Sequence, residues 1–169
     1  MRCWEMYKLE WINQTDVKQF SELLGEVFEK SSWIAMQAAK VRPFESKDAL
    51  YEHMVTIVKQ ADYTQQLQLI NNHPNLGERV QMSDYSTKEQ QQAGLNALTE
   101  EEYRNFLNVN EAYMKKFSFP FIIAVREKSK DEIYQSMIKR LEHDPEVEFQ
   151  TALTQIYAIA KFRLDELIL

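Results

Sequence analysis

The sequence predicts an all-α fold: a single compact domain of roughly eight helices, with one irregular apolar segment near residues 117–125. The 169-residue chain has the length of an ordinary single domain and is long enough to bury a core. Only three glycines and four prolines occur, too few to turn the many short strands of a β-sandwich or barrel. Apolar residues recur at three- and four-residue spacing, which places them on one face of a helix.

The first part of the chain is predicted to hold four helices, each with a start or a stop signal. Proline ends the second helix, expected over residues 32–40, because it excludes the preceding residue from helical geometry. The signals in chain order are Thr15 as an N-cap, Arg42-Pro43 as a stop, and Ser46 and Thr64 as N-caps.

Three Ser/Thr-x-x-Glu sequences predict capping boxes, in which the hydroxyl and the glutamate each satisfy a backbone N–H at the helix start. They are Ser86 with Glu89, Thr99 with Glu102, and Ser129 with Glu132. Asp144-Pro145 then combines an N-cap with proline at the first helical position, and should open a long helix through Leu164.

Charge, cysteine content and hydropathy exclude several classes of protein. Acidic residues outnumber basic ones by 26 to 20 and the two are interspersed, so the concentrated basic face that nucleic acid requires is absent. Cys3 is the only cysteine, which rules out an intramolecular disulfide or a thiolate zinc cluster. The longest apolar stretch, residues 119–125, is too short to cross a bilayer, and no signal peptide precedes it. We therefore expect a cytoplasmic protein with no membrane or nucleic-acid partner.

Two stretches interrupt the helical pattern. The first begins at His73-Pro74 and continues through a polar run; the second is the apolar segment at residues 117–125, where Pro120 argues against a regular helix. Pro74 keeps His73 in a loop, from which a side chain can be directed into a cleft. Buried irregular backbone leaves N–H groups in need of partners, which a ligand could supply.

The residues alone do not settle a function. His53, within a predicted helix, and His143, near a helix C-terminus, are expected to be structural. His73 is the candidate for chemistry, although a lone histidine lacks a diagnostic partner. Glu89 has a competing role in its capping box, and Arg163 has one as a surface ion-pair residue on the last helix.

Taken together and in order, three segments carry a family resemblance. They are His73-Pro74-Asn75-Leu76-Gly77, the STKEQQQAGL sequence at residues 86–95, and Phe117-Ser118-Phe119-Pro120-Phe121-Ile122. They resemble the signatures of the 2-oxo-4-hydroxy-4-carboxy-5-ureidoimidazoline (OHCU) decarboxylase family, and residues 31–35, 42–44 and 156–164 extend the likeness over nearly the whole chain. One departure is Ser118, where the family usually has glycine.

Within that family the chain is similar to the N-terminal part of Bacillus-type bifunctional uricase proteins, in which a urate oxidase domain follows the decarboxylase. Residues 1–169 are therefore expected to form one decarboxylase-like domain, with a fused or associated urate oxidase as a partner. The resemblance implies an all-helical, typically homodimeric carboxy-lyase that uses neither a metal nor an organic cofactor. Its small-molecule substrate would be OHCU, which it converts to S-allantoin in urate degradation.

The resemblance also assigns roles to particular residues. His73 and Glu89 become the catalytic pair, and Pro74 fixes their loop. The implied substrate-binding groups are Ser86, Gln90, Arg163 and the backbone at Ile122 and Ile123.

The chemistry suits these residue types. OHCU carries a carboxylate and a hydroxyl on one ring carbon, beside an imine that can take up the electron pair released with CO2, so the substrate is its own electron sink. Histidine titrates near working pH, and a neighbouring carboxylate can orient its ring or repel the leaving carboxylate. Two rival hypotheses remain: a non-catalytic helical interaction module of a uricase assembly, and an enzyme of ureide breakdown that consumes allantoin.

Overall fold

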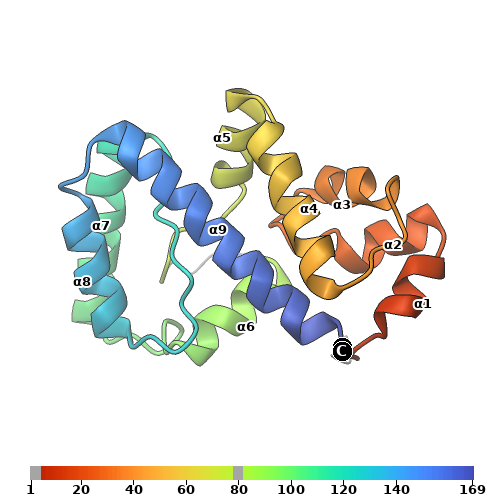
Figure 1. Ribbon diagram of the computed structural model, residues 1–169. Helices are drawn as coiled ribbons and strands as arrows, with labels where there is room; N and C mark the ends of the chain where they lie inside the picture. The colour runs from red at the N-terminus through yellow and green to blue at the C-terminus, as the bar shows by residue number, and fades with distance from the viewer. Residues whose placement is uncertain (1–4, 78–81) are drawn as a thin grey trace. The chain divides into compact units, whose positions relative to one another are not determined.

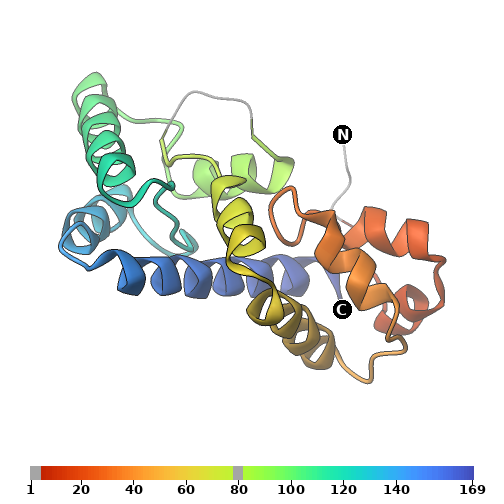
Figure 2. The same ribbon diagram turned by 90° about the horizontal axis from the view of Figure 1, so that it is seen from above.

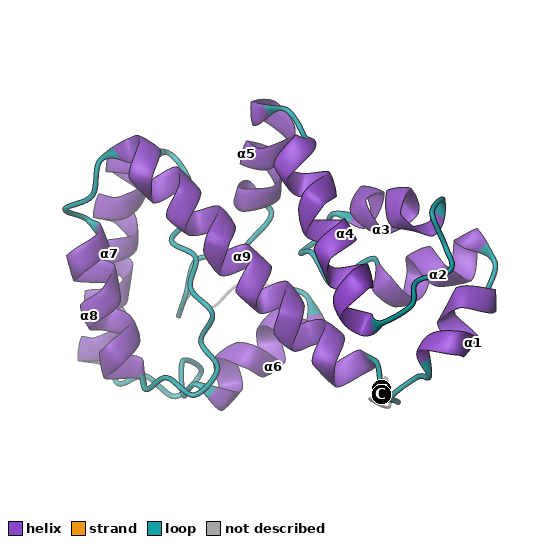
Figure 3. Ribbon diagram, viewed as in Figure 1, coloured by secondary structure: helices purple, strands orange, loops and turns teal. Residues whose placement is uncertain are grey.

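The computed structural model describes residues 5–77 and 82–169, and every regular element in that part of the chain is a helix (Figures 1 and 3). Nine helices are present there, eight of them with seven residues or more, so the all-α prediction is confirmed. None of these helices is long and apolar enough to cross a bilayer. Cys3 lies outside the described residues.

Contacts between helices divide the described residues into two units, which are described separately. We call residues 5–69 and 157–169 the terminal unit, and residues 70–77 and 82–156 the central unit. Two helices have residues in both units: α5, Tyr63–Asn71, and the 23-residue α9, Pro145–Leu167, the long helix in Figure 2.

In the terminal unit, α3 packs against both α2 and α4. Arg42, just after α3, contacts residues of three helices or their ends. Its guanidinium donates to the Thr15 carbonyl at 2.5 Å and to the Ala39 carbonyl at 3.0 Å. The guanidinium carbon lies 4.8 Å from the centre of the Phe20 ring. The helices of this unit, besides its parts of α5 and α9, are α1 (Leu9–Gln14), α2 (Val17–Leu24), α3 (Ser32–Ala39) and α4 (Lys47–Gln60).

Ser46 caps α4 as predicted, but the two predicted threonine N-caps are wrong. The cap of α2 is Asp16, whose carboxylate accepts from the Gln19 N–H at 2.7 Å, while the Thr15 hydroxyl donates to a carbonyl of α1. In α5 the corresponding acceptor is Asp62, and Thr64 lies inside the helix. In both cases an aspartate stands close to the threonine, and its negative charge is favoured at the positive end of the helix.

In the central unit, α7 and α8 pack against each other. The capping boxes at Thr99 and Ser129 are confirmed, and Pro145 is the first residue of α9, as predicted. Besides its part of α9, the unit contains α6 (Asp84–Gln92), α7 (Glu100–Phe117) and α8 (Lys130–Arg140).

The predicted capping box of Ser86 with Glu89 is wrong. The helix begins earlier, and the hydroxyl of Ser83 accepts from the Ser86 N–H at 3.2 Å. Ser83 is followed by Asp84 in the first turn, where an acidic side chain interacts favourably with the helix dipole. Glu89 therefore lies in the interior of α6, and its carboxylate is not part of a cap.

Removing the Ser83 hydroxyl tests this assignment. Ser83→Ala should lower the free energy of unfolding by about 1 kcal/mol, because the Ser86 N–H loses its acceptor. Ser83→Asp is the matched control and should keep the stability close to that of the wild type, since aspartate also caps well. Urea denaturation measures both; equal stability of Ser83→Ala and the wild type would place the start of α6 elsewhere.

Candidate active site

His73 lies in the loop that follows α5, as the sequence predicts, and its side chain is buried. Its backbone N–H donates to the Ile70 carbonyl at 3.1 Å, which closes the end of the helix.

Two buried side chains fasten the loop after His73. The Nδ2 of Asn110 on α7 donates to the Leu76 carbonyl at 2.9 Å, and the Gly77 N–H donates to the Oε1 of Gln90 on α6 at 3.1 Å. Gly77 has a φ of +74°, and a Cβ there would come within 3.1 Å of Leu98 Cδ1. The loop is therefore held to two helices at a point where only glycine fits without strain.

The predicted polar residues of α6 share one face of that helix, because residues three and four apart are neighbours on a helical surface. Ser86 and Gln90 are buried and Glu89 is half-buried. Since Gln90 bonds to Gly77, this face is tied to the loop that carries His73. The structure thus links four of the predicted site residues, His73, Ser86, Glu89 and Gln90, through one helix and one loop of the central unit.

Gln90 has a divided role. Its Oε1 is committed to the Gly77 N–H, which fixes the orientation of the amide. Its Nε2 makes no hydrogen bond to any residue in the described part of the chain. Gln90 can therefore offer a ligand its Nε2 as a donor.

The apolar segment after α7 is buried and irregular, as predicted. Residues 119–125 carry neither helix nor strand, and all of them are buried (teal between α7 and α8 in Figure 3). The segment begins after Ser118, which has a left-handed φ of +62°. This is the conformation that glycine adopts most easily, and here a serine adopts it at the end of α7.

Side chains also fasten this segment. The Ile122 carbonyl accepts from Nη1 of Arg140 at 2.6 Å, and the Ala124 N–H donates to Oε1 of Gln155 on α9 at 3.0 Å. Ile122 and Ile123, predicted to bind substrate through their backbone, therefore lie in a part of the chain whose path is set by α8 and α9.

Arg163 belongs to the terminal unit. It is almost fully buried; its Nη2 lies 2.9 Å from an oxygen of the buried Glu29, and its Nη1 donates to the Glu26 carbonyl at 2.9 Å. The alternative that Arg163 forms only surface ion pairs is wrong, whereas its neighbours Lys161 and Asp165 do pair on the surface, with Asp48 and Lys47 respectively. Its role in binding substrate remains a prediction.

The other two histidines have structural contacts, as expected. His53 on α4 packs against Phe44, with ring centres 5.8 Å apart. Nδ1 of His143 lies 2.8 Å from a carboxylate oxygen of Glu148, so its partner is an acidic side chain as well as the end of a helix.

Sequence reasoning missed Asn110, Arg140 and Glu148. The only available signal was periodicity: Asn110 stands among Phe106, Tyr113 and Phe117 on the apolar stripe of α7, and Glu148 stands one turn before the buried Ala152 of α9. A polar residue at such a position must be paired inside the protein. Periodicity marks the position but does not identify the partner.

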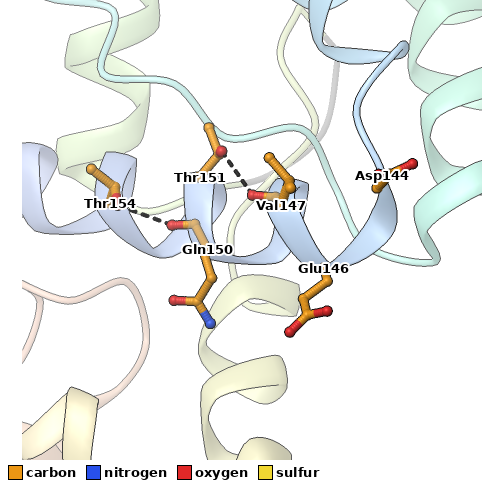
Figure 4. Close-up of a pocket in the computed structure, with 6 residues that line it drawn as sticks. All are labelled: Asp144, Glu146, Val147, Gln150, Thr151 and Thr154. Carbon is orange, nitrogen blue, oxygen red and sulfur yellow. Dashed lines mark hydrogen bonds between the residues drawn. The ribbon is translucent and has the colours of Figure 1, made fainter.

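A surface pocket on the first half of α9 is a separate feature (Figure 4). Two of its threonine hydroxyls donate to carbonyls of their own helix, Thr151 to Val147 and Thr154 to Gln150. None of the predicted site residues lines it. In the described part of the chain, no three acidic, histidine or cysteine side chains converge in a way that could hold a metal ion.

The fold and the site define an all-helical protein in which a buried histidine loop is fastened to a polar helix face. The sequence model of the OHCU decarboxylase family matches residues 13–165. The chain therefore belongs to the OHCU decarboxylase family, and the family prediction is confirmed.

Individual relatives agree with this assignment. The chain is 48% identical to the uric acid degradation bifunctional protein PucL of Bacillus subtilis over 163 residues, which are 96% of this chain and 33% of that protein. It is 42% identical to the 2-oxo-4-hydroxy-4-carboxy-5-ureidoimidazoline decarboxylase of Halalkalicoccus jeotgali, with 94% of this chain and 90% of that protein covered. The chain thus spans about a third of the two Bacillus bifunctional relatives and 90% of the Halalkalicoccus one.

Two solved structures share the fold. The crystal structure of (S)-allantoin synthase matches with a TM-score of 0.78 at 28% identity, over 95% of this chain and 54% of that one. An OHCU decarboxylase crystallised in the presence of (S)-allantoin matches with a TM-score of 0.69 over 89% of this chain and 96% of that one; at 24% identity it supports the fold alone.

Asn110 provides a test of how the His73 loop is held. Asn110→Leu removes the donor to the Leu76 carbonyl and leaves a buried acceptor unpaired, so the free energy of unfolding should fall by about 1 to 3 kcal/mol. Exchange of the backbone amides near residues 73–77 should accelerate as well. Val109→Ala on the same helix is the control: it removes buried apolar volume but no hydrogen bond to this loop. Unchanged exchange in Asn110→Leu would show that Asn110 does not hold the loop.

Proposed function

We propose that this chain catalyses the decarboxylation of OHCU to S-allantoin without an organic cofactor. The observation that carries the proposal is the buried His73 loop, fastened by Gln90 to the helix face of Ser86 and Glu89, in a chain of the OHCU decarboxylase family. A buried histidine in a loop that is bonded to a carboxylate-bearing helix face is suited to directed proton transfer.

The reaction needs little beyond orientation and proton movement. The bond between the ring carbon and the carboxylate breaks and CO2 leaves. The released electron pair forms a double bond to the neighbouring imine carbon while the imine nitrogen takes up a proton, which gives an enol. The enol hydroxyl then loses its proton as the former imine carbon gains one, on the face that yields S-allantoin. In total the substrate loses CO2 and gains one proton, which a protonated imidazole at His73 can supply.

Glu89 has two candidate roles in this scheme. Its carboxylate can hold the imidazole of His73 and stabilise its charged form, or it can repel the leaving carboxylate. Because α6 is capped by Ser83, neither role competes with a bond to the start of the helix.

We propose that hydrogen-bond donors of the protein hold the substrate. Gln90 offers its Nε2 as a donor, which suits an acceptor such as a carbonyl oxygen of the substrate. The Ser86 hydroxyl, the backbone at Ile122 and Ile123, and the planar fork of Arg163 complete the set, with Pro74 restricting the loop. A fork fixed by Glu29 loses less conformational entropy on binding than a mobile one does.

The rival hypothesis of a non-catalytic interaction module is not favoured. This chain covers 90% or more of the length of two relatives that are themselves named decarboxylases.

We further propose a homodimer in the cytoplasm, as the family resemblance implies. Because the Bacillus relatives are about three times as long and are named bifunctional, we also propose that this domain works with a fused or associated urate oxidase.

Substitution of the catalytic pair tests the proposed activity. Freshly generated OHCU, made from urate with uricase and 5-hydroxyisourate hydrolase, is followed by the circular dichroism of S-allantoin. His73→Ala should lower the rate by about 100-fold to 10,000-fold, the usual contribution of a general acid or base, with little change in melting temperature. A wild-type protein that gave no acceleration over the spontaneous rate would exclude the decarboxylase proposal.

Glu89→Gln tests the role of the carboxylate in the same assay. It keeps the shape of the side chain and one acceptor oxygen but removes the charge, so the rate should fall at least tenfold. Gln91→Glu, on an exposed position of the same helix, is the control for a change of charge by one unit and should keep the wild-type rate. An unaltered rate in Glu89→Gln would remove Glu89 from the catalytic pair.

The proposed homodimer is tested by sedimentation velocity at micromolar concentration. A dimer gives twice the 20.1 kDa mass of the chain. A species of 20.1 kDa across the whole concentration range would contradict it.

A further inference from the structure

A buried carboxylate, Glu148, lies in the central unit. Glu148 is fully buried and accepts from the Tyr113 hydroxyl at 2.5 Å and from Nε of Arg140 at 2.7 Å, while Nδ1 of His143 lies 2.8 Å from its other oxygen. Burial, and then the adjacent Glu148, raises the pKa of Tyr113 far above its ordinary value. Tyr113 therefore stays protonated and remains a donor.

Arg140 joins this cluster to the irregular apolar segment. While Nε bonds to Glu148, Nη1 donates to the Ile122 carbonyl at 2.6 Å. The guanidinium carbon also lies 4.2 Å from the centre of the Phe121 ring. Only arginine has a rigid planar fork that can make both bonds at once, so Glu148 fixes the direction from which Arg140 meets the Ile122 carbonyl.

The planarity of the peptide carries this constraint to the next residue. In a trans peptide the C=O and the following N–H point in opposite directions, and the Ile122–Ile123 bond is trans. The Ile123 N–H is therefore directed away from Arg140. It makes no hydrogen bond within the described residues although Ile123 is only 7% exposed, whereas the next N–H, of Ala124, is taken by Gln155.

Buried backbone N–H groups are almost always paired, and one without a protein partner is available to a ligand. We propose that Arg140, held by Glu148, is a positioning residue that presents the Ile123 N–H to an oxygen of the substrate. This inference rests on the proposed function, in which the backbone at Ile122 and Ile123 binds OHCU.

Stability alone does not explain why the buried ion pair of Arg140 and Glu148 is present. A buried ion pair is on average no more stabilising than apolar residues that fill the same space, because desolvation of the two charges offsets their attraction. Arginine supplies two directed hydrogen bonds, one to Glu148 and one to the Ile122 carbonyl, which an apolar residue cannot make. Its orienting effect on the peptide is therefore the property to test.

Arg140→Lys is the informative variant, because it keeps the positive charge beside Glu148 but loses the fork. The KM for OHCU should rise about tenfold with kcat changed much less, since a binding contact of this kind acts on ground state and transition state alike. Lys130→Gln, which removes a surface ion pair with Glu102 in the same unit, is the charge control and should keep the wild-type KM. Ile133→Val, a buried change on the same helix that breaks no bond to the segment, is the stability control.

Amide hydrogen exchange of residues 119–125 gives a second measurement that needs no substrate. Exchange should be faster in Arg140→Lys than in Lys130→Gln or Ile133→Val. If Arg140→Lys does not fold, Glu148→Gln replaces it, with an expected rise in KM of about threefold because a neutral acceptor holds the guanidinium less firmly.

The outcomes separate the two proposals. The positioning role is overturned if folded Arg140→Lys has both the KM and the amide exchange of the wild type. It is also overturned if Ile133→Val raises KM as much as Arg140→Lys does.

If the wild-type protein shows no OHCU decay above background, the proposed function fails. In that case faster exchange of residues 119–125 in Arg140→Lys alone still supports positioning, and exchange equal to that of the two control variants overturns it.

Discussion

Buried backbone that is neither helix nor strand must find its hydrogen-bond partners in side chains, and this requirement shapes the central unit. Asn110 and Gln90 supply partners for the loop after His73, and Arg140 and Gln155 supply them for the apolar segment. All four reach from helices, which are the rigid elements of an all-α protein. The two loops that bear the proposed chemistry therefore take their positions from helix side chains.

This arrangement places polar residues where helix periodicity calls for apolar ones. Asn110 lies on the buried stripe of α7, and Glu148 on that of α9. An unpaired polar group at such a site costs about 1 to 3 kcal/mol, and the bonds of Asn110 Nδ2 to the Leu76 carbonyl and of Glu148 to Arg140 offset that cost. These polar residues give up part of the stability that apolar residues would provide, and in return they fix the positions of the loops, as is common at functional sites.

Local signals in the sequence predicted the helices well because caps and periodicity involve neighbours along the chain. The boxes at Thr99 and Ser129 and the start at Pro145 were correct for this reason. Thr15, Thr64 and Ser86 were wrong because a competing cap residue stood within three positions, and the pattern alone does not rank the competitors. The bonds from Asn110 to Leu76 and from Tyr113 to Glu148 span 34 and 35 residues, beyond the reach of any local pattern.

The start of α6 decides what Glu89 can do. In a helix that began after Ser86, its carboxylate would turn back to the first backbone N–H groups, and a capped carboxylate is a poor partner for an imidazole. With Ser83 as the cap, Glu89 stands in the second turn, on the face shared by Ser86 and Gln90. Gln90 then connects that face to Gly77 and so to the His73 loop. A shift of the helix start by three residues therefore frees the Glu89 carboxylate from the capping box and leaves it available for the catalytic role that we propose.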